Sequence, residues 1–468
     1  MTAYTLPESV SPDHATVTPA KTTARFGLRT LLRLRKDPLA TVTSIARAAD
    51  LVELRVGAER LFVISHPDQV ERVLKTNAKG YAKSKFYDRL KPIFGNGMIV
   101  AEGAAWKRQR ETARPAFGSH VLRAVADAAV TQAQQFMEDV KAGAGATDVG
   151  EAMMRLTLAV ALKVLFNTEA DRATTQRLQG AITTALRTAE KRMWALFPLF
   201  SRLPGPSTLR FRRAIRTLDD FVYGMIAGRR AMGEAMPRDL LTHMLQWRDP
   251  ETGKGLPDQI LRDEILFMVL AAHETTAAAL AWTFSLLAEH PEERQRVQAE
   301  LDQVLQGKTP GWDDLSNLPV TRGALLESMR LYPPAWSLSR TALADDVVGG
   351  FAIPKGSSLM VCPWLTHRDD RFWDQPQAFR PDRFIGDAED QHHAFAYFPF
   401  GGGPRLCIGN NFALIEAMAV LATVLPALEL DVAPGAVITP EPMISLRPHG
   451  LMMAGRDRVR PAPNRQAA

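Results

Sequence analysis

The spacing of apolar residues predicts helices for most of the chain, because apolar positions recur every three or four residues from Pro67 onward. A loop that contains glycine and proline interrupts this pattern at 91–103. Strand-like runs occur toward both ends of the chain, at 51–56, 60–65, 342–361 and 440–453. The first two runs are joined by Gly57-Ala58-Glu59 and predict a β-hairpin. The pattern therefore predicts a mainly α-helical protein with small β-sheets, an α+β fold.

The longest predicted helix covers Gln259–Glu289 and stops at Pro291. At 1.5 Å per residue it spans roughly 45 Å, which is enough to cross the whole molecule. Its apolar middle contains His273-Glu274-Thr275-Thr276, and buried polar groups are costly unless they are paired or used. A threonine there can bond to a carbonyl one turn earlier and bend the helix. The threonines either pack against a neighbouring helix or line a functional groove.

Composition indicates a soluble globular protein with a large core, with 46% hydrophobic and 23% charged residues. The net charge of +6 is too weak to indicate nucleic-acid binding. Residues 1–23 contain neither an apolar run of roughly 20 residues nor the layout of a signal peptide. We therefore expect a cytoplasmic protein without a transmembrane anchor. A flexible segment at 1–24 and a flexible tail at 456–468 would flank a single domain at 25–455.

The chain has two cysteines, Cys362 and Cys407, which excludes a disulfide framework and a paired-thiolate zinc site. Cys362 lies in a strand-like run and is interpreted as a small core residue. Cys407 lies in the glycine-rich stretch Phe400–Gly409, directly before a helical pattern. A thiolate is an axial ligand of haem iron, and glycines allow a flat macrocycle to approach the backbone. The alternative is a buried structural cysteine in a glycine and proline loop.

This stretch resembles the signature of the cytochrome P-450 family, the haem-thiolate monooxygenases. In that signature a phenylalanine, a glycine and an arginine precede the ligand by seven, four and two positions, and a glycine follows two positions later. The matching residues are Phe400, Gly403, Arg405, Cys407 and Gly409. The resemblance covers nearly the whole chain. It implies haem b bound through Cys407 to iron, within a cytochrome P-450 fold whose long central helix lies over the haem.

The same resemblance assigns roles within the long helix, where Ala271 to Thr275 match the family pattern of small residue, glycine, any residue, acid and threonine. Ala272 replaces the usual glycine, so the oxygen groove is expected to be narrower. Glu274 would supply protons and Thr275 would hold the reacting oxygen. Peroxide-driven relatives tend to lack this pair, so dioxygen with electrons is the expected oxidant.

Two further sets of residues match the family. A buried three-way ion pair that locks the loop before the iron ligand is implied for Glu327, Arg330 and Arg383. The two propionates of haem need cations or donors. The resemblance assigns that role to Trp106, Arg110, Arg340 and Arg405.

The resemblance implies an oxidoreductase that inserts one oxygen atom from O2 into a lipophilic substrate, by hydroxylation or epoxidation. Substrate contacts are expected from segments rich in Phe, Leu, Met and Trp: 81–103, 185–203, 267–275, 335–338 and 443–446. The chain lacks flavin, dinucleotide and iron-sulfur motifs. Electrons would therefore come from a separate ferredoxin or flavodoxin with its reductase, docked near Lys107, Arg108 and Arg114. The alternatives are a haem-thiolate sensor or carrier without turnover, and a haem-thiolate isomerase or peroxygenase.

Overall fold

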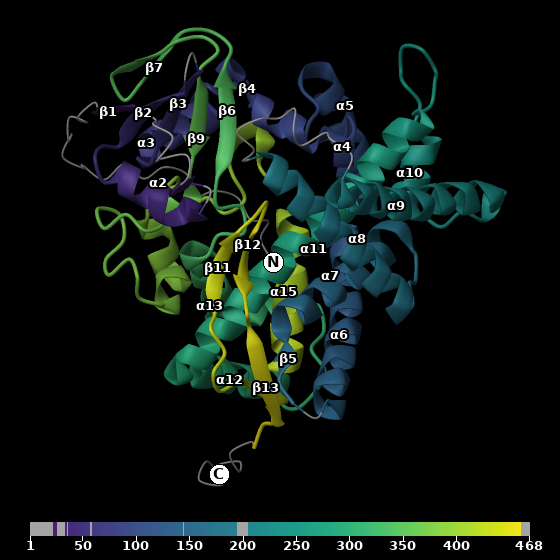
Figure 1. The fold of residues 1–468 in the computed structure, drawn as a ribbon. Helices are drawn as coiled ribbons and strands as arrows, with labels where there is room; N and C mark the ends of the chain where they lie inside the picture. Colours follow the sequence, from purple (N-terminus) through teal and green to yellow (C-terminus); the bar gives the residue numbers. More distant parts are fainter. Residues whose placement is uncertain are drawn as a thin grey trace.

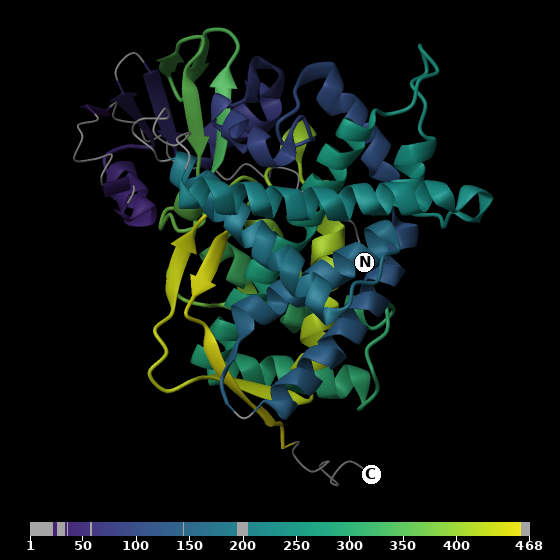
Figure 2. The ribbon, with the colours of Figure 1, turned by 45° about the vertical axis from the view of Figure 1, so that its right-hand side comes forward.

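The computed structural model describes residues 22–25, 33–34, 36–56, 59–143, 145–193 and 205–459. Helices make up most of the molecule, and small β-sheets lie along one side (Figure 1). In Figure 2 the C-terminal strands lie below the largest sheet, and helices form the opposite side. The predicted fold class is confirmed.

The helices follow the predicted apolar spacing. The α-helices are α2 (Pro38–Ala46), α3 (Pro67–Glu71), α4 (Lys91–Phe94), α5 (Gly103–Ala113), α6 (Ser119–Ala142), α7 (Val149–Phe166), α8 (Arg172–Met193), α9 (Pro206–Ala231), α10 (Leu240–Gln246), α11 (Asp258–Glu289), α12 (Pro291–Leu305), α13 (Pro319–Leu331), α14 (Pro363–Thr366) and α15 (Asn410–Val424). Short helices of other types include the π-helix η1 (Arg72–Thr76) and the 3-10 helices η8 (Pro381–Phe384) and η10 (Gly403–Arg405).

The strands form one large sheet and three small ones. They are β1 (Thr22–Arg25), β2 (Leu51–Val56), β3 (Glu59–Ile64), β4 (Tyr81–Lys83), β5 (Thr147–Asp148), β6 (Leu338–Ala342), β7 (Asp346–Val348), β8 (Phe351–Ile353), β9 (Ser358–Val361), β10 (Leu428–Val432), β11 (Thr439–Pro442), β12 (Leu446–His449) and β13 (Met452–Asp457). The large sheet has the order β1-β2-β3-β9-β6-β4, and the small sheets are β10-β13-β5, β11-β12 and β7-β8. The predicted hairpin is β2-β3, in which Leu51 pairs with Ile64; Gly57 and Ala58 lie outside the described residues.

The ends of the chain join the fold more than the sequence analysis expected. Residues 22–24 were assigned to a flexible segment, but they belong to β1, which pairs in parallel with β2. Residues 456 and 457 were assigned to the tail, but they belong to β13 and pair with β10. The next residue, Arg458, forms an ion pair of 2.7 Å with Asp302 on α12. These segments are short and polar, so their order depends on pairing partners that local periodicity does not reveal.

The long central helix is confirmed as α11, which ends at Glu289, two residues before Pro291, as predicted. It is the one described helix that is long and apolar enough to cross a membrane, but 78% of its apolar window is buried inside the protein. Such burial is typical of a core helix. Cys362 is fully buried and its Sγ donates a hydrogen bond of 3.2 Å to the Trp336 carbonyl, which fits the predicted core role.

A buried ion pair connects α13 to the segment that follows β9. Arg330 makes a two-pronged contact with Glu327, with Nε to Oε2 at 2.7 Å and Nη2 to Oε1 at 2.8 Å, and both side chains are fully buried. Arg383 on η8 adds a third contact, Nε to Glu327 Oε1, at 3.3 Å. Arg330 also donates to the carbonyls of residues 367, 376 and 378. The network thus fixes the path of the chain between α14 and η8.

We expect Glu327→Gln to lower the free energy of unfolding by about 3–5 kcal/mol, because it leaves two guanidinium groups without a counter-charge in the interior. Thermal unfolding followed by circular dichroism measures this loss. Glu293→Gln is the matched control, since Glu293 pairs with Arg296 at the same i,i+3 spacing but Arg296 is 42% exposed. Its expected cost is below about 1 kcal/mol. Equal losses in the two variants would contradict the structural role of the network.

Candidate active site

The loop that precedes α15 carries Cys407 and has a fixed backbone shape. Gly401 and Gly403 have φ values of +72° and +64°, a region that favours glycine. A Cβ at Gly403 would collide with the carbonyl oxygen of Leu74 on η1. Glycine is therefore needed at 403 for packing against η1, whereas the sequence analysis explained it by the approach of a macrocycle. The amide of Cys407 donates to the Phe400 carbonyl at 3.0 Å, which closes the loop.

The Cys407 side chain is exposed, yet the surrounding protein atoms affect the pKa of its thiol as burial does. Burial raises the pKa of the thiol, while the backbone N–H of Gly409 and the Arg110 guanidinium oppose that rise. An accessible sulfur among so many protein atoms lies in a recess of the molecule. Arg110 approaches from α5, and its Nη2 donates to the Leu406 carbonyl at 2.8 Å. The sulfur is therefore free for a ligand bond and stands beside groups that stabilise its anion.

One stripe of α11 is accessible although the helix is otherwise buried. Between Leu261 and Leu287 every residue is buried except four partly exposed ones, Phe267, Ala271, Ala272 and Thr275. Positions 267, 271 and 275 are four residues apart and lie on one face of the helix. Phe267 meets the ring of Phe94 edge to face, with the centroids 6.1 Å apart. This face combines small and aromatic side chains, as a site for an apolar ligand requires.

The polar residues of α11 have separate partners. The Thr275 hydroxyl donates to the Ala271 carbonyl at 3.0 Å, and the Thr276 hydroxyl donates to the Ala272 carbonyl at 3.3 Å. His273 is fully buried and burial lowers its pKa to about 4, so its ring is neutral near pH 7. Thr276 is also buried, and Thr275 is the hydroxyl on the accessible stripe. This difference distinguishes the two threonines, which the sequence pattern alone did not.

Glu274 is directed away from the accessible stripe, toward the C-terminal hairpin β11-β12. Its Oε1 accepts a hydrogen bond from the Ser445 hydroxyl at 2.8 Å and lies 3.9 Å from Nε of Arg447. Burial raises the pKa of its carboxyl group, and Arg447 and Ser445 act in the opposite direction. Sequence reasoning missed both partners, because they lie about 170 residues further along the chain and belong to no recognisable motif.

Cationic side chains surround the ring of Trp106. The guanidinium carbons of Arg405 and Arg110 lie 5.5 and 5.7 Å from its centroid, and Nζ of Lys83 lies 6.0 Å away. Arg405 pairs with Glu102, with N–O distances of 2.6 and 2.9 Å. Burial lowers the pKa of Lys83 to about 7. Lys83 and Glu102 are further residues of this cluster that the sequence analysis did not identify.

Arg340 on β6 is a buried cation that makes no direct ion pair among the described residues, although the charge of Glu102 acts on it from a distance. It is 7% exposed, and its contacts are neutral: Nη1 donates to the Ser339 carbonyl at 3.0 Å, and the Tyr87 hydroxyl is its other partner. Burial lowers the pKa of its guanidinium. A buried unpaired charge is costly, so this position calls for an anionic group. The two propionates of haem fit this requirement, and the accessible thiol of Cys407 fits its iron.

The structure brings residues of α5 and of the loop before α15 together: Trp106 meets Arg405, and Arg110 reaches the Leu406 carbonyl beside Cys407. Arg340 of β6 is close enough to Arg405 for their charges to interact, and α11 carries the accessible stripe. Within the expected substrate segments, residues 194–203 lie outside the described residues. The predicted ion-pair residues Glu327, Arg330 and Arg383 meet at the network described above.

Comparison with known proteins gives a consistent result. The family model described as Cytochrome P450 matches residues 23–454. Cyclooctat-9-en-7-ol 5-monooxygenase of Streptomyces melanosporofaciens is 34% identical over 413 residues, which cover 87% of this chain and 88% of that protein. Pentalenene oxygenase of Streptomyces avermitilis is 32% identical, with 87% and 90% covered. The crystal structure of the cytochrome P450DA heme domain superposes with a TM-score of 0.84 at 25% identity and covers 94% of this chain and 98% of that one.

We expect Arg340→Met to stabilise the haem-free protein, because it removes an unpaired buried charge, and to speed haem loss about ten-fold or more. Thermal unfolding of haem-free protein and haem transfer to apomyoglobin measure the two effects. Arg229→Met is the matched control, since Arg229 is equally buried but pairs with Asp239 at 2.5 Å. That variant should destabilise the haem-free protein. If Arg340→Met destabilised it as well, the site would not be built for an anion.

Proposed function

Because this chain belongs to the cytochrome P450 family and is a haem-dependent monooxygenase for a lipophilic substrate, we propose that its substrate is a terpenoid hydrocarbon or alcohol. The two relatives named above carry cyclooctat-9-en-7-ol and pentalenene in their names, and a third relative is named cyclooctatin synthase. The accessible stripe of α11 supports this class, because alanines leave space and Phe267 offers an apolar surface. No charged residue lies on that stripe.

The proposal rests most on two accessible groups, the thiol of Cys407 in the loop before α15 and the hydroxyl of Thr275 on α11. When bound, haem with a thiolate ligand supplies the activation of dioxygen for insertion into a C–H or C=C bond. Cys407 provides the thiolate, and the N–H of Gly409 and the charge of Arg110 stabilise its negative charge. Arg340 and Arg405 neutralise the propionates, and Trp106 packs beside Arg405.

Thr275 and Glu274 have different roles in proton transfer. The Thr275 hydroxyl lies on the accessible stripe, and its hydrogen bond to the Ala271 carbonyl fixes where its oxygen can accept or donate. Glu274 is the next residue and is buried, and burial raises the pKa of its carboxyl group, which favours the form that stores a proton. The two side chains face different sides of α11. A proton must therefore pass from Glu274 to Thr275 through a water molecule or a change of rotamer.

A spectral titration tests the substrate class. Terpenoid alkenes and alcohols should shift the Soret band of the ferric protein as they displace water from the iron, with saturable binding in the micromolar range. Fatty acids of similar size serve as the comparison ligands. In Cys407→Ala the thiolate-type Soret band of the ferrous carbon monoxide complex should be lost, whereas Cys362→Ala should keep it. Saturable shifts with fatty acids alone would contradict the terpenoid proposal.

We also propose that a ferredoxin or flavodoxin is the electron donor and that it docks on α5. The protein would then be located with this donor in the cytoplasm. Lys107 on this helix and Arg114 directly after it are exposed, and Arg110 of the same helix reaches the backbone beside Cys407. Arg108 contributes less charge than expected from the sequence, because it forms an ion pair of 3.5 Å with Asp249. An acidic partner would meet Lys107 and Arg114 close to the thiolate, where the path for an electron is short.

Lys107→Glu combined with Arg114→Glu should slow the first electron transfer from an acidic donor by about ten-fold or more at low salt, while haem content stays unchanged. Stopped-flow reduction measures the rate. Added salt should slow the wild-type protein too, because the Debye length falls from about 10 Å at 0.1 M to about 3 Å at 1 M. Lys163→Glu with Arg230→Glu is the charge-matched control on other helices. Rates that respond to neither salt nor the α5 reversal would place the docking surface elsewhere.

A further inference from the structure

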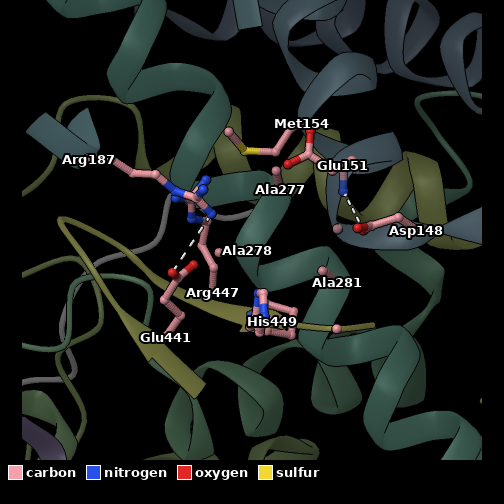
Figure 3. Close-up of a pocket in the computed structure, with 13 residues that line it drawn as sticks. Asp148, Glu151, Met154, Arg187, Ala277, Ala278, Ala281, Glu441, Arg447 and His449 are labelled. Carbon is pink, nitrogen blue, oxygen red and sulfur yellow. Dashed lines mark hydrogen bonds and ion pairs between the residues drawn. The ribbon is translucent and has the colours of Figure 1, made fainter. Parts of the chain in front are cut away.

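A small polar pocket lies between α11, the start of α7 and the hairpin β11-β12 (Figure 3). One of its lining residues, Arg447, lies next to Glu274. We propose that this pocket is the port through which protons from solvent reach Glu274, and that Arg447 is the positioning residue that controls the passage. The proposal rests on the proton-storing role of Glu274 given above, and it adds the source of the protons. Each insertion of oxygen from O2 releases the second oxygen atom as water and consumes two protons, which must come from solvent.

The pocket has room for several water molecules. Its volume is about 50 Å³, and one water needs roughly 10–15 Å³ of such space. Four elements enclose it: the start of α7, one side chain of α8, α11, and the hairpin β11-β12 with the turn that follows. The lining residues are Asp148, Gly150, Glu151, Met154, Arg187, Ala277, Ala278, Ala281, Glu441, Arg447, Pro448, His449 and Gly450.

The floor of the pocket is the face of α11 that carries Glu274. Ala277, Ala278 and Ala281 follow Glu274 by three, four and seven residues, so they lie on the same side of the helix. Their small side chains leave the space that water would fill. The pocket therefore begins within one or two helical turns of the acid.

Arg447 connects the pocket to Glu274. It lines the pocket, and its Nε lies 3.9 Å from Oε1 of Glu274. The side chain is 8% exposed, and Nε has no hydrogen-bond acceptor in the part of the chain that the structure describes. Buried N–H groups almost always have a partner. A water molecule in the pocket would supply this partner and stand next to the carboxyl group.

Charged side chains line the outer end of the pocket. Glu441 and Arg187 form a loose pair of 3.9 Å and are 36% and 53% exposed. In Figure 3 their charged ends meet beside Arg447. Glu190 on α8 lies close enough for Glu441 to act on it. Burial raises its pKa to about 7, with Glu441 adding to the rise and Arg447, Arg187 and Lys191 opposing it. Glu190 thus interacts with the charges at the outer end, although it does not itself line the pocket.

The other charged groups at the pocket are engaged or point outward. Asp148 accepts the Glu151 amide at 2.9 Å as a helix cap, Glu151 contacts Gln179, and His449 is exposed. Arg447 can pair with either of two carboxylates, that of Glu274 or that of Glu441, because Glu441 is its cross-strand neighbour in β11-β12. When Arg447 lies next to Glu274, its charge favours the ionised acid and opposes the effect of burial. When the guanidinium turns to Glu441, Glu274 can take a proton from pocket water and later release it toward Thr275.

The first test fills the pocket without changing its charge. Ala278→Leu should slow product formation at least five-fold, raise the solvent deuterium isotope effect and divert electrons to hydrogen peroxide. Haem content, substrate affinity and first-electron transfer should match the wild type. Ala279→Leu is the matched control, because Ala279 is equally buried on α11 but does not line the pocket. Equal effects of the two substitutions on the isotope effect would overturn the proposal.

The second test needs no turnover. Infrared titration of the resting protein follows carboxylic acid bands, which Glu190→Gln and Glu274→Gln assign. Arg447→Met should raise the midpoints of both bands by at least one pH unit, since a cation is removed from each acid, whereas unchanged midpoints would overturn the role of Arg447.

Thr275→Ala distinguishes the proton port from the proposed relay between Glu274 and Thr275. If Thr275→Ala diverts electrons to peroxide but Ala278→Leu and Arg447→Met behave as wild type, the port is wrong; if Thr275→Ala stays coupled, the proposed relay is wrong.

Discussion

The fold depends on a carboxylate that three neighbouring donors hold inside the protein. Glu327 is fully buried, and it accepts from the side chains of Arg330 and Arg383 and from the amide of Arg380. A buried pair of this kind stabilises little by itself, because desolvation offsets most of the attraction. Its effect is to admit one arrangement of the chain, since any other would leave a charge unpaired. The long irregular stretch before the iron-binding loop contains few regular elements, so it needs such a constraint.

The same rule, that buried charge requires a partner, explains the contrast between two regions of the site. Around Glu274 the protein provides its own partners, and the acid is held in place before any substrate arrives. Around Arg340 the hydrogen-bond partners are neutral and no carboxylate is in ion-pair contact. A haem propionate placed there would relieve this electrostatic penalty. Cofactor binding would then be coupled to a local instability of the haem-free protein.

Sequence reasoning succeeded where a pattern is local. The spacing within Phe400–Gly409 and the apolar run of α11 are short-range features, and both identified their elements correctly. It failed where a contact joins distant segments. Lys83, Glu102, Ser445 and Arg447 lie in no motif, and their importance follows only from side chains that meet across elements. Strands of two or three residues, such as β4 and β5, are too short for periodicity to reveal, and they exist because a neighbouring strand pairs with them.

The position of the hairpin β11-β12 near the end of the chain has a consequence for biosynthesis. Ser445 lies 171 residues after Glu274, and β13 pairs with β5 across about 300 residues. These contacts cannot form until the later segment of each pair has been synthesised. Chains with many such distant contacts fold slowly and expose apolar surface while they wait. The acid in the middle of α11 therefore remains without Ser445 and Arg447 while the intervening segment of about 170 residues is made.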